Sequence, residues 1–260
     1  MDGVNKTLYI PLYGKALVSS HGVILEDKKA EEIWESAEFP LKRRARSKHL
    51  AYYMAMRARV FDLWLENKLA ENENALVLHL GCGLDSRVLR VKSECLWYDI
   101  DFDEVICERK RFFEKTERYH MVSADISNVD FIKNLPNSDT CLVILEGVAM
   151  YLEPCVLTSL FKEVAEKYPN VCVLMDVYTS FGAKMSKIKN PIKTVGAGKV
   201  YGIKNKEKLE GLTKMHVSER EMTPSYLTDE LSGMDKGIFK LLYAGKISKK
   251  IYKLYELEKK

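Results

Sequence analysis

Several features that mark membrane, secreted or metal-binding proteins are missing from this sequence. No apolar run approaches the roughly 20 residues that a transmembrane helix needs. The first residues, Met1 to Lys6, do not have the pattern of a signal peptide, so we expect a cytoplasmic protein without a membrane partner. The six cysteines include no Cys-x-x-Cys pair, and most stand in apolar runs, which predicts reduced core residues. No metal-ligand spacing is visible, and we expect no bound metal.

A surplus of one sign of charge is also missing. There are 41 basic and 37 acidic side chains, and a net charge of +4 does not indicate a nucleic-acid partner. The basic run Lys42 to Lys48 is more typical of one solvated face of a helix. With 260 residues, 47% hydrophobic and 30% charged, the chain fits one large α/β domain with additions. The sequence does not indicate an oligomeric state.

The most informative stretch runs from Ala75 to Asp101. Residues 75–80 form a continuous apolar run, as expected for a strand buried on both faces of a parallel sheet. It ends at Gly81-Cys82-Gly83, where the absence of Cβ atoms lets the backbone approach a ligand. A second apolar run ends at Asp101, twenty positions after Gly81. Strand, glycine turn, helix, strand and terminal acid predict half of a nucleotide-binding α/β sheet, with the acid on the ribose hydroxyls.

The glycine pattern also bears on which cofactor binds. A dinucleotide fingerprint has a third glycine three residues after the second, and this chain has Ser86 there. An NAD-dependent oxidoreductase is therefore disfavoured. An S-adenosylmethionine site needs only the close approach at Gly81 and Gly83 together with the ribose acid at Asp101. We therefore predict S-adenosylmethionine as the cofactor and S-adenosylhomocysteine as its product.

Two motifs carry a resemblance to a known family. Gly81-Cys-Gly-Leu-Asp-Ser-Arg87 followed by Asp99-Ile-Asp101 resembles the Gly-x-Gly-x-Asp-x-Arg turn of the leucine carboxyl methyltransferase superfamily, and Glu146 to Leu152 resembles its second signature. The opening Pro11 to Lys15, with Asp27 to Ala30, is similar to the branch of tetracenomycin-type polyketide O-methyltransferases. The resemblance implies a Rossmann-like class I methyltransferase: an α/β fold with a mostly parallel seven-stranded sheet, an antiparallel C-terminal hairpin and a helical N-terminal addition.

A long helix over Leu50 to Leu69 is predicted from apolar side chains spaced three and four residues apart. Arg57 falls inside its apolar stripe, whereas Arg59 points to the opposite side. An arginine in a buried stripe needs an anionic partner. That partner is either an acid of the protein, in a structural salt bridge, or the carboxylate of the cofactor's methionine. The second interpretation follows from the resemblance, because Arg57 to Asp62 matches the family's arginine motif before the glycine strand.

Four later residues are further site candidates. Asp125 follows a predicted strand over 119–124; in sheets of this class such an acid accepts from the adenine amino group, and the backbone of Ile126 faces the ring. Asp125 is also compatible with a helix N-cap. Glu146 ends the strand over 141–145 at the edge where open α/β sheets bind ligands, and the family places a cofactor-facing acid there. Tyr151 closes the same signature and is the candidate to position the methyl acceptor.

The remaining chain gives a coarser pattern. We expect a helical addition over 1–70, with Pro11, Gly14 and Gly22 as breakers, and a cofactor-binding part over 71–260 within one structural domain. Helices are predicted over 102–117, 154–167 and 222–234, a strand over 171–177, and a cover or substrate segment near 180–235. Apolar runs over 239–243 and 247–255 predict the closing hairpin.

The predicted reaction is methyl transfer to a hydroxyl or carboxyl oxygen of a small, polyketide-like molecule. A carboxylate is ionised at neutral pH and needs no base, whereas a phenol with a pKa near 10 gains from one. None of the five histidines is paired with an acid by its spacing, and His79, in the first strand, is predicted to be a hydrogen-bonded core residue. Two alternatives stay open: methylation of a protein's C-terminal carboxyl group, and a nucleic-acid-binding module of methyltransferase fold.

Overall fold

A seven-stranded sheet forms the centre of the molecule. The computed structural model describes residues 5–37, 39–43, 45–186 and 199–259, with side chains from residue 7 onward. The strands are β1 (Leu76–Leu80), β2 (Leu96–Asp101), β3 (Tyr119–Ser123), β4 (Thr140–Leu145), β5 (Asn170–Tyr178), β6 (His216–Arg220) and β7 (Tyr252–Glu258). Their order is β3-β2-β1-β4-β5-β7-β6. Strands β1 to β5 pair in parallel, and β7 is antiparallel to both β5 and β6. The predicted mostly parallel seven-stranded sheet is therefore confirmed.

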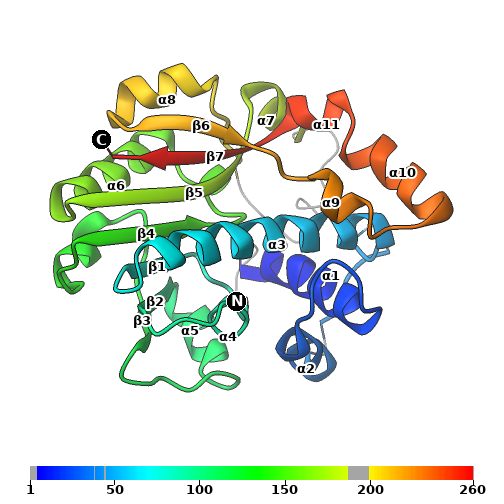
Figure 1. Ribbon diagram of the computed structural model, residues 1–260, viewed down its shortest axis with the longest axis horizontal. Coiled ribbons are helices and arrows are strands. Elements are labelled where there is room, and N and C mark those ends of the chain that lie inside the picture. The colour runs from blue at the N-terminus through cyan, green and yellow to red at the C-terminus, as the bar shows by residue number, and fades with distance from the viewer. Residues whose placement is uncertain (1–4, 38, 44, 187–198, 260) are drawn as a thin grey trace.

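Helices cover both faces of this sheet (Figure 1). The α-helices are α1 (Tyr9–Ser20), α2 (Lys28–Ser36), α3 (Lys48–Glu71), α4 (Arg87–Arg90), α5 (Asp103–Arg109), α6 (Pro154–Lys167), α7 (Ser180–Ser186), α8 (Lys206–Thr213), α9 (Ser225–Thr228), α10 (Gly233–Tyr243) and α11 (Lys246–Ile251). Short 3-10 turns are η1 (Asn5–Leu8), η2 (Val129–Asn134) and η3 (Ala149–Tyr151). One buried apolar cluster joins α3 to one face of the sheet, and another joins α6 and α8 to the opposite face.

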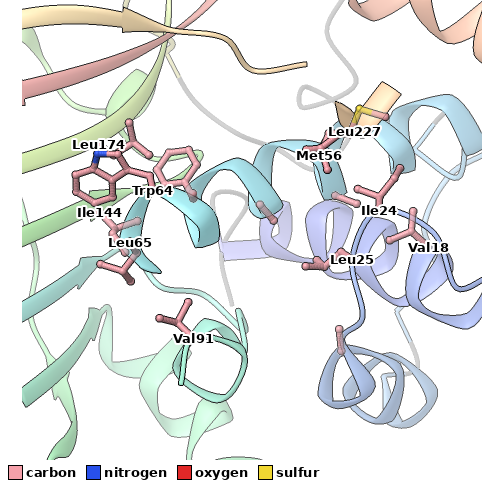
Figure 2. Packing of buried hydrophobic residues seen from close by; sticks show 14 of the residues in the cluster. Val18, Ile24, Leu25, Met56, Trp64, Leu65, Val91, Ile144, Leu174 and Leu227 are labelled. Carbon is pink, nitrogen blue, oxygen red and sulfur yellow. The ribbon is translucent and has the colours of Figure 1, made fainter. Parts of the chain in front are cut away.

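Helix α3 links the sheet to the N-terminal helices. In Figure 2, Trp64 and Leu65 lie with Ile144 and Leu174 of the sheet, while Met56, nearer the start of the helix, lies beside Leu227. The Trp64 indole also donates to Glu256 Oε1 of β7 at 2.9 Å. Side chains of α1, α3 and the sheet belong to one continuous apolar cluster, so α3 is held in place over the strands.

Two residues expected to break the first helix lie inside it. Pro11 stands in the first turn of α1, where its missing N–H would have no intrahelical partner in any case. A Cβ on Gly14 would lie 3.0 Å from Met54 Cβ, so this glycine allows α1 and α3 to pack closely. The basic run does not form a helical face, because α3 begins only at Lys48 and the described residues before it are turns and irregular chain.

The C-terminal hairpin was predicted in the wrong place. Residues 239–243 belong to α10, because Phe239 packs against Tyr52 of α3 while Leu241 faces solvent, which is a helical rather than an alternating pattern. Residues 247–251 belong to α11, and β7 follows them. The antiparallel partners of β7 are β5 and β6, which lie far from it in sequence.

Other boundaries also differ from the prediction. Helix α5 ends at Arg109 rather than 117, and the Arg109 side chain is buried against Asp99. The helix expected over 222–234 is only the four-residue α9, and α10 starts afresh at Gly233, which has a φ of +54°. The expected cover segment, 180–235, holds the edge strand β6 as well as helices, and its residues 187–198 lie outside the described residues.

Candidate active site

All nine residues that the sequence singled out line one cavity at the carboxyl ends of the parallel strands. Its volume is about 740 Å³. Strand β1 leads into the glycine turn, β2 ends at Asp101, β4 leads to Glu146, and α3 brings Arg57 from outside the sheet. The nine are Arg57, Gly81, Cys82, Gly83, Asp101, Asp125, Ile126, Glu146 and Tyr151. These residues come together because β2, β1 and β4 are neighbours in the sheet, an order that cannot be read from the sequence.

The glycine turn has two different reasons to lack side chains. Gly81 and Gly83 have φ values of +66° and +53°, in the left-handed region that L-residues rarely adopt. A Cβ on Gly81 would overlap Val148 Cγ2, so Gly81 also lets the loop after β4 pack against the turn. Of the residues that the structure describes, a Cβ on Gly83 would meet only Leu8, at 3.5 Å. Burial raises the pKa of the Cys82 thiol above its ordinary value.

Asp101 is held by the turn that it faces. Its Oδ2 accepts from the Gly83 N–H at 2.7 Å and its Oδ1 from the Phe102 N–H at 2.8 Å. Burial raises its pKa above the ordinary value, although these two backbone donors favour the charged form. Each carboxylate oxygen has a second lone pair, so Asp101 can still accept hydroxyl hydrogens from a ligand in the cavity.

Asp125 and Ile126 begin the loop after β3. Asp125 is exposed, and its Oδ1 accepts from the Ser127 N–H at 2.9 Å, which fixes a tight turn. It does not cap a helix, since η2 begins at Val129 with Asn128 as its cap. Ile126 is buried in the apolar cluster that contains α6 and lines the cavity. The loop therefore presents an acid and an apolar side chain at the same rim.

Arg57 and Glu146 meet at the centre of the cavity wall. Arg57 donates from Nε to Glu146 Oε1 at 3.0 Å and from Nη1 to Asp176 Oδ2 at 2.9 Å. Its Nη2 lies over Gly147, 3.4 Å from where a Cβ would stand. Burial opposes ionisation of Glu146, but Arg57 and Arg87 outweigh it and lower its pKa. Both side chains are therefore charged within the wall.

Three charged residues near this wall, Lys15, Asp85 and Arg87, stand in the quoted motifs but were given no role from the sequence. Arg87 is fully buried and pairs with Asp62 at 2.6 Å and with Glu146. Lys15 of α1 is 3% exposed, lines the cavity and pairs with Asp85 Oδ2 at 3.1 Å. A buried lysine in an otherwise apolar helix, spaced to face α3, is the sequence signal that could have indicated this position.

His79 is a structural residue, as predicted. Strands β1 and β2 pair it with Asp99 in register, and His79 Nδ1 lies 3.1 Å from Asp99 Oδ1. Its other ring nitrogen lies 3.3 Å from Arg87 Nη1. Asp99 also binds Arg109 and accepts from the Tyr119 hydroxyl at 2.7 Å. The His79–Asp99 pair was not predicted from spacing, because the two residues are 20 positions apart and meet only across neighbouring strands.

The far half of the cavity is apolar and rich in tyrosine. Helices α3, α10 and α11 form its wall together with the ends of β5 and β7. Its lining residues are Leu50, Tyr53, Met54, Tyr178, Leu242, Tyr243, Ile247, Ser248, Ile251 and Tyr252. Tyr151, on η3, also lines the cavity, and burial raises the pKa of its hydroxyl above the ordinary value.

Some expected features concern the whole chain. All six cysteines are free, but only Cys82, Cys95 and Cys141 are buried, and Cys107 and Cys155 are exposed, so the expectation of core cysteines holds for part of the set. Among the described residues, no group of three His, Cys, Asp or Glu side chains could hold a metal ion.

Within the same residues, no helix is both long and apolar enough to cross a bilayer.

The sheet order and the ligand-facing edge define a class I methyltransferase fold. The leucine carboxyl methyltransferase family model matches residues 5–165. The tetracenomycin polyketide synthesis O-methyltransferase TcmP of Streptomyces glaucescens is 30% identical over 213 residues, covering 81% of this chain and 79% of that protein. The S-adenosyl-L-methionine-dependent methyltransferase dpfgK of Gibberella zeae is 29% identical over 186 residues, covering 65% of this chain and 62% of that protein. The chain belongs to the leucine carboxyl methyltransferase family, and it is an S-adenosylmethionine-dependent methyltransferase.

Solved structures agree on the fold. A crystal structure from Thermobifida fusca YX superposes with a TM-score of 0.63 at 15% identity, covering 96% of this chain and 94% of that one. Magnesium protoporphyrin IX methyltransferase from Synechocystis PCC 6803, with bound S-adenosylhomocysteine, superposes with a TM-score of 0.52 at 11% identity, covering 90% and 94%. At these identities the likeness concerns the fold alone.

Proposed function

We propose that this enzyme methylates a hydroxyl or carboxyl oxygen of a small, polyketide-like molecule bound in the apolar half of the cavity. The observation that carries the proposal is the cavity itself. A polar end, built from the carboxyl ends of β1, β2 and β4, runs directly into an end walled by tyrosine and aliphatic side chains. Cofactor and acceptor therefore have adjoining spaces, which a direct transfer between them requires.

The residues of the polar end fit S-adenosylmethionine. Asp101 suits the ribose hydroxyls, because its carboxyl group lies next to the glycine turn and keeps free lone pairs. Asp125 and Ile126 suit the adenine, one through its carboxylate and the other through its apolar surface. Lys15 and Arg57 are the cationic side chains among the lining residues, and they suit the methionine carboxylate.

The contacts of Arg57 within the protein limit how its guanidinium can bind the methionine carboxylate. Nε and Nη1 are occupied by Glu146, Asp176 and Tyr252, so a grip with two nitrogens would require an acid to leave. The Nη2 over Gly147 supports a single hydrogen bond instead. Glu146 then acts mainly by holding Arg57, and its carboxylate is close enough to the cavity to accept from the cofactor's ammonium group.

The lining residues favour an acceptor that is already ionised. S-adenosylmethionine supplies an activated methyl group, and the acceptor oxygen has to displace it in line. His79 is the histidine among the lining residues, and both of its ring nitrogens face Asp99 or Arg87. The Tyr151 hydroxyl, with its raised pKa, is neutral at pH 7 and suits positioning by donating a hydrogen bond. A carboxylate acceptor fits this setting better than a phenol.

The acceptor class is supported by one relative and by the shape of the site. TcmP takes part in tetracenomycin polyketide synthesis, as its name states. The apolar half of the cavity, with five tyrosines in or beside it, suits a flat aromatic body with few charges. The small net charge and the ion-paired lysines of α10 give no support to a nucleic-acid acceptor.

The test is a transfer assay with methyl-labelled S-adenosylmethionine and matched acceptors. Aromatic carboxylic acids are compared with phenols of the same skeleton, and a peptide with a free C-terminal leucine serves as the protein-type acceptor. We expect labelled product from the aromatic set, and mild base should release the label from an ester but not from an ether. Label on the peptide alone would contradict the small-molecule proposal.

A further inference from the structure

A chain of buried charges runs from the start of α2 to the end of β5. Every member touches the next through an ion pair, and each cation contacts at least one acid. The acids are Asp27, Asp62, Asp85, Glu146 and Asp176, and the cations are Lys15, Arg57, Arg87 and Arg90. Five carboxylates thus face four cations, so this network has one uncompensated negative charge.

The surplus charge is best assigned to Asp176. The other acids of the network, except Asp27, each contact two or more of its cations, whereas Asp176 contacts only Arg57, which it shares with Glu146. The remaining contacts of Asp176 are neutral: its Oδ1 accepts from the Gly147 N–H at 2.6 Å, and its Oδ2 accepts from the Tyr252 hydroxyl. Asp27 also contacts a single cation, Arg90, but it is the N-cap of α2, and a helix N-terminus stabilises a negative charge.

Asp176 lies directly behind the cavity wall. Its side chain is fully buried, and three residues that contact it, Arg57, Gly147 and Tyr252, line the cavity. Burial raises its pKa, against the effects of Arg57, the Tyr252 hydroxyl and the Gly147 N–H. Because burial opposes its ionisation, the Asp176 carboxylate is stabilised by any further positive charge that enters the neighbouring cavity.

The cofactor and its product differ by that charge. S-adenosylmethionine has a sulfonium, an ammonium and a carboxylate, and its net charge is +1. When the acceptor oxygen's lone pair forms the new O–C bond, the S–C bond breaks and its electrons remain on sulfur. S-adenosylhomocysteine is therefore a neutral thioether with zero net charge and almost the same shape.

We propose that Asp176 makes this site prefer the sulfonium cofactor over its neutral product, and so favours product release after each transfer. The proposal rests on the cofactor position described above, with its methionine end at Arg57 and Gly147. The preference is electrostatic, because the buried negative charge stabilises the sulfonium and gains nothing from the thioether. In a partly buried setting, one unit charge at several ångströms changes relative affinity by roughly tenfold or more.

The test compares two ligands on a set of variants by calorimetry. Dissociation constants for S-adenosylmethionine and S-adenosylhomocysteine are measured with wild type, Asp176→Asn, Asp176→Glu and Tyr252→Phe. We expect Asp176→Asn to reduce the preference for S-adenosylmethionine about tenfold. Asp176→Glu keeps the charge and should keep most of the preference, even if both affinities fall. Tyr252→Phe removes a hydrogen bond to the same carboxylate without changing its charge, and it should alter both affinities in parallel.

Equal losses for both ligands in Asp176→Asn would overturn the proposal, because they would make Asp176 a purely structural support of Arg57. Unchanged affinities would overturn it as well. If Asp176→Asn does not fold, the dissociation constant of sinefungin is measured with wild type instead. Sinefungin has an amine that provides a cation in place of the sulfonium. Wild type that binds the neutral thioether more tightly than both cationic ligands would contradict the proposal. Failure of the cofactor position itself is distinguished by Asp101→Ala, which would then leave both affinities unchanged.

Discussion

Arg57 and Arg59 stand two positions apart on α3 and serve opposite environments. Arg57 Nη1 lies 2.9 Å from Asp176 Oδ2 inside the protein, with both side chains at most 5% exposed. Arg59 Nη1 lies 3.1 Å from Glu66 Oε1 on the outer side, where the two side chains are 31% and 38% exposed. The rotation of about 200° between them follows from helix geometry, so only Arg57 can reach the cavity.

Arg57→Lys should weaken cofactor binding, and Arg59→Lys should have little effect. Lysine keeps the charge but cannot satisfy Glu146 and Asp176 while also reaching the ligand, because it lacks the guanidinium fork. We expect the dissociation constant of S-adenosylhomocysteine to rise by about tenfold or more, corresponding to about 1.4 kcal/mol. Calorimetry on both variants measures the effect.

Methylthioadenosine provides the control for that experiment, because it lacks the amino-acid tail. If Arg57 binds the tail, Arg57→Lys should leave methylthioadenosine binding nearly unchanged. An equal loss for both ligands would show that Arg57 acts only as a structural ion pair.

Asp101→Ala should weaken S-adenosylhomocysteine binding by about 1–3 kcal/mol through lost hydrogen bonds to the ribose. The matched control is Asp103→Ala, which removes an exposed acid that bonds to Ser123 and does not line the cavity. Each variant loses one carboxylate, but Asp101 lines the cavity and Asp103 does not. Similar calorimetric constants for both would rule out the ribose assignment.

Glu146→Gln should fold, with a loss of stability that depends on pH. Arg57 and Arg87 hold the folded-state pKa of Glu146 below its ordinary value of 4.5, against the effect of burial. An acid with a lowered folded pKa contributes stability above its unfolded pKa, and that contribution is lost as pH falls through the folded pKa. The gap in unfolding free energy between wild type and variant should therefore be full at pH 7 and shrink below about pH 4.5. A gap independent of pH would contradict the assigned ion pairs.

Gly81→Ala should destabilise the protein more than Gly22→Ala. The two glycines have nearly the same φ, +66° and +65°, so the backbone strain of about 1–2 kcal/mol is common to both. A Cβ at Gly22 meets no described residue within 4 Å, whereas one at Gly81 overlaps Val148. We expect an extra loss of roughly 1–3 kcal/mol at Gly81 in denaturant titrations. Val148→Ala in the same chain should restore part of it, and failure to do so would disprove the packing explanation.

Arg87→Met should cost about 3–5 kcal/mol of unfolding free energy, because it leaves Asp62, Asp85 and Glu146 buried beside fewer cations. Arg111→Met is the comparison, since Arg111 pairs with Glu108 on the surface with 64% of its side chain exposed. Chemical denaturation should show little change for that variant. A comparably small loss for Arg87→Met would mean that the network tolerates an unpaired acid.

Much of the site could be read from the order of residues alone. The apolar run before Gly81, the glycine turn and the acid at Asp101 predicted the edge of the sheet where the cavity lies, because a parallel strand, a tight turn and a terminal acid each have a local signature. The helical stripe containing Arg57 predicted its inward direction for the same reason. These features depend on neighbours within a few positions along the chain.

Other features depended on contacts between distant segments. Residues 239–243 look apolar enough for a strand, but the packing of Phe239 on α3 makes them part of a helix. Pro11 and Gly14 look like breakers, yet the first turn of α1 tolerates the proline and close packing on Met54 requires the glycine. Local propensity is weak compared with burial, so tertiary contacts decided each of these elements.

The sequence by itself determined the fold class, the family and the identity of the cofactor, since these are specified by local pattern and motif. Only the tertiary structure showed that Arg57 is shared between Glu146 and Asp176, that Lys15 faces the cavity, and that His79 is paired with Asp99. The physical reason is that a buried charge is defined by its partners, and these partners come from helices and strands that only the folded sheet brings together.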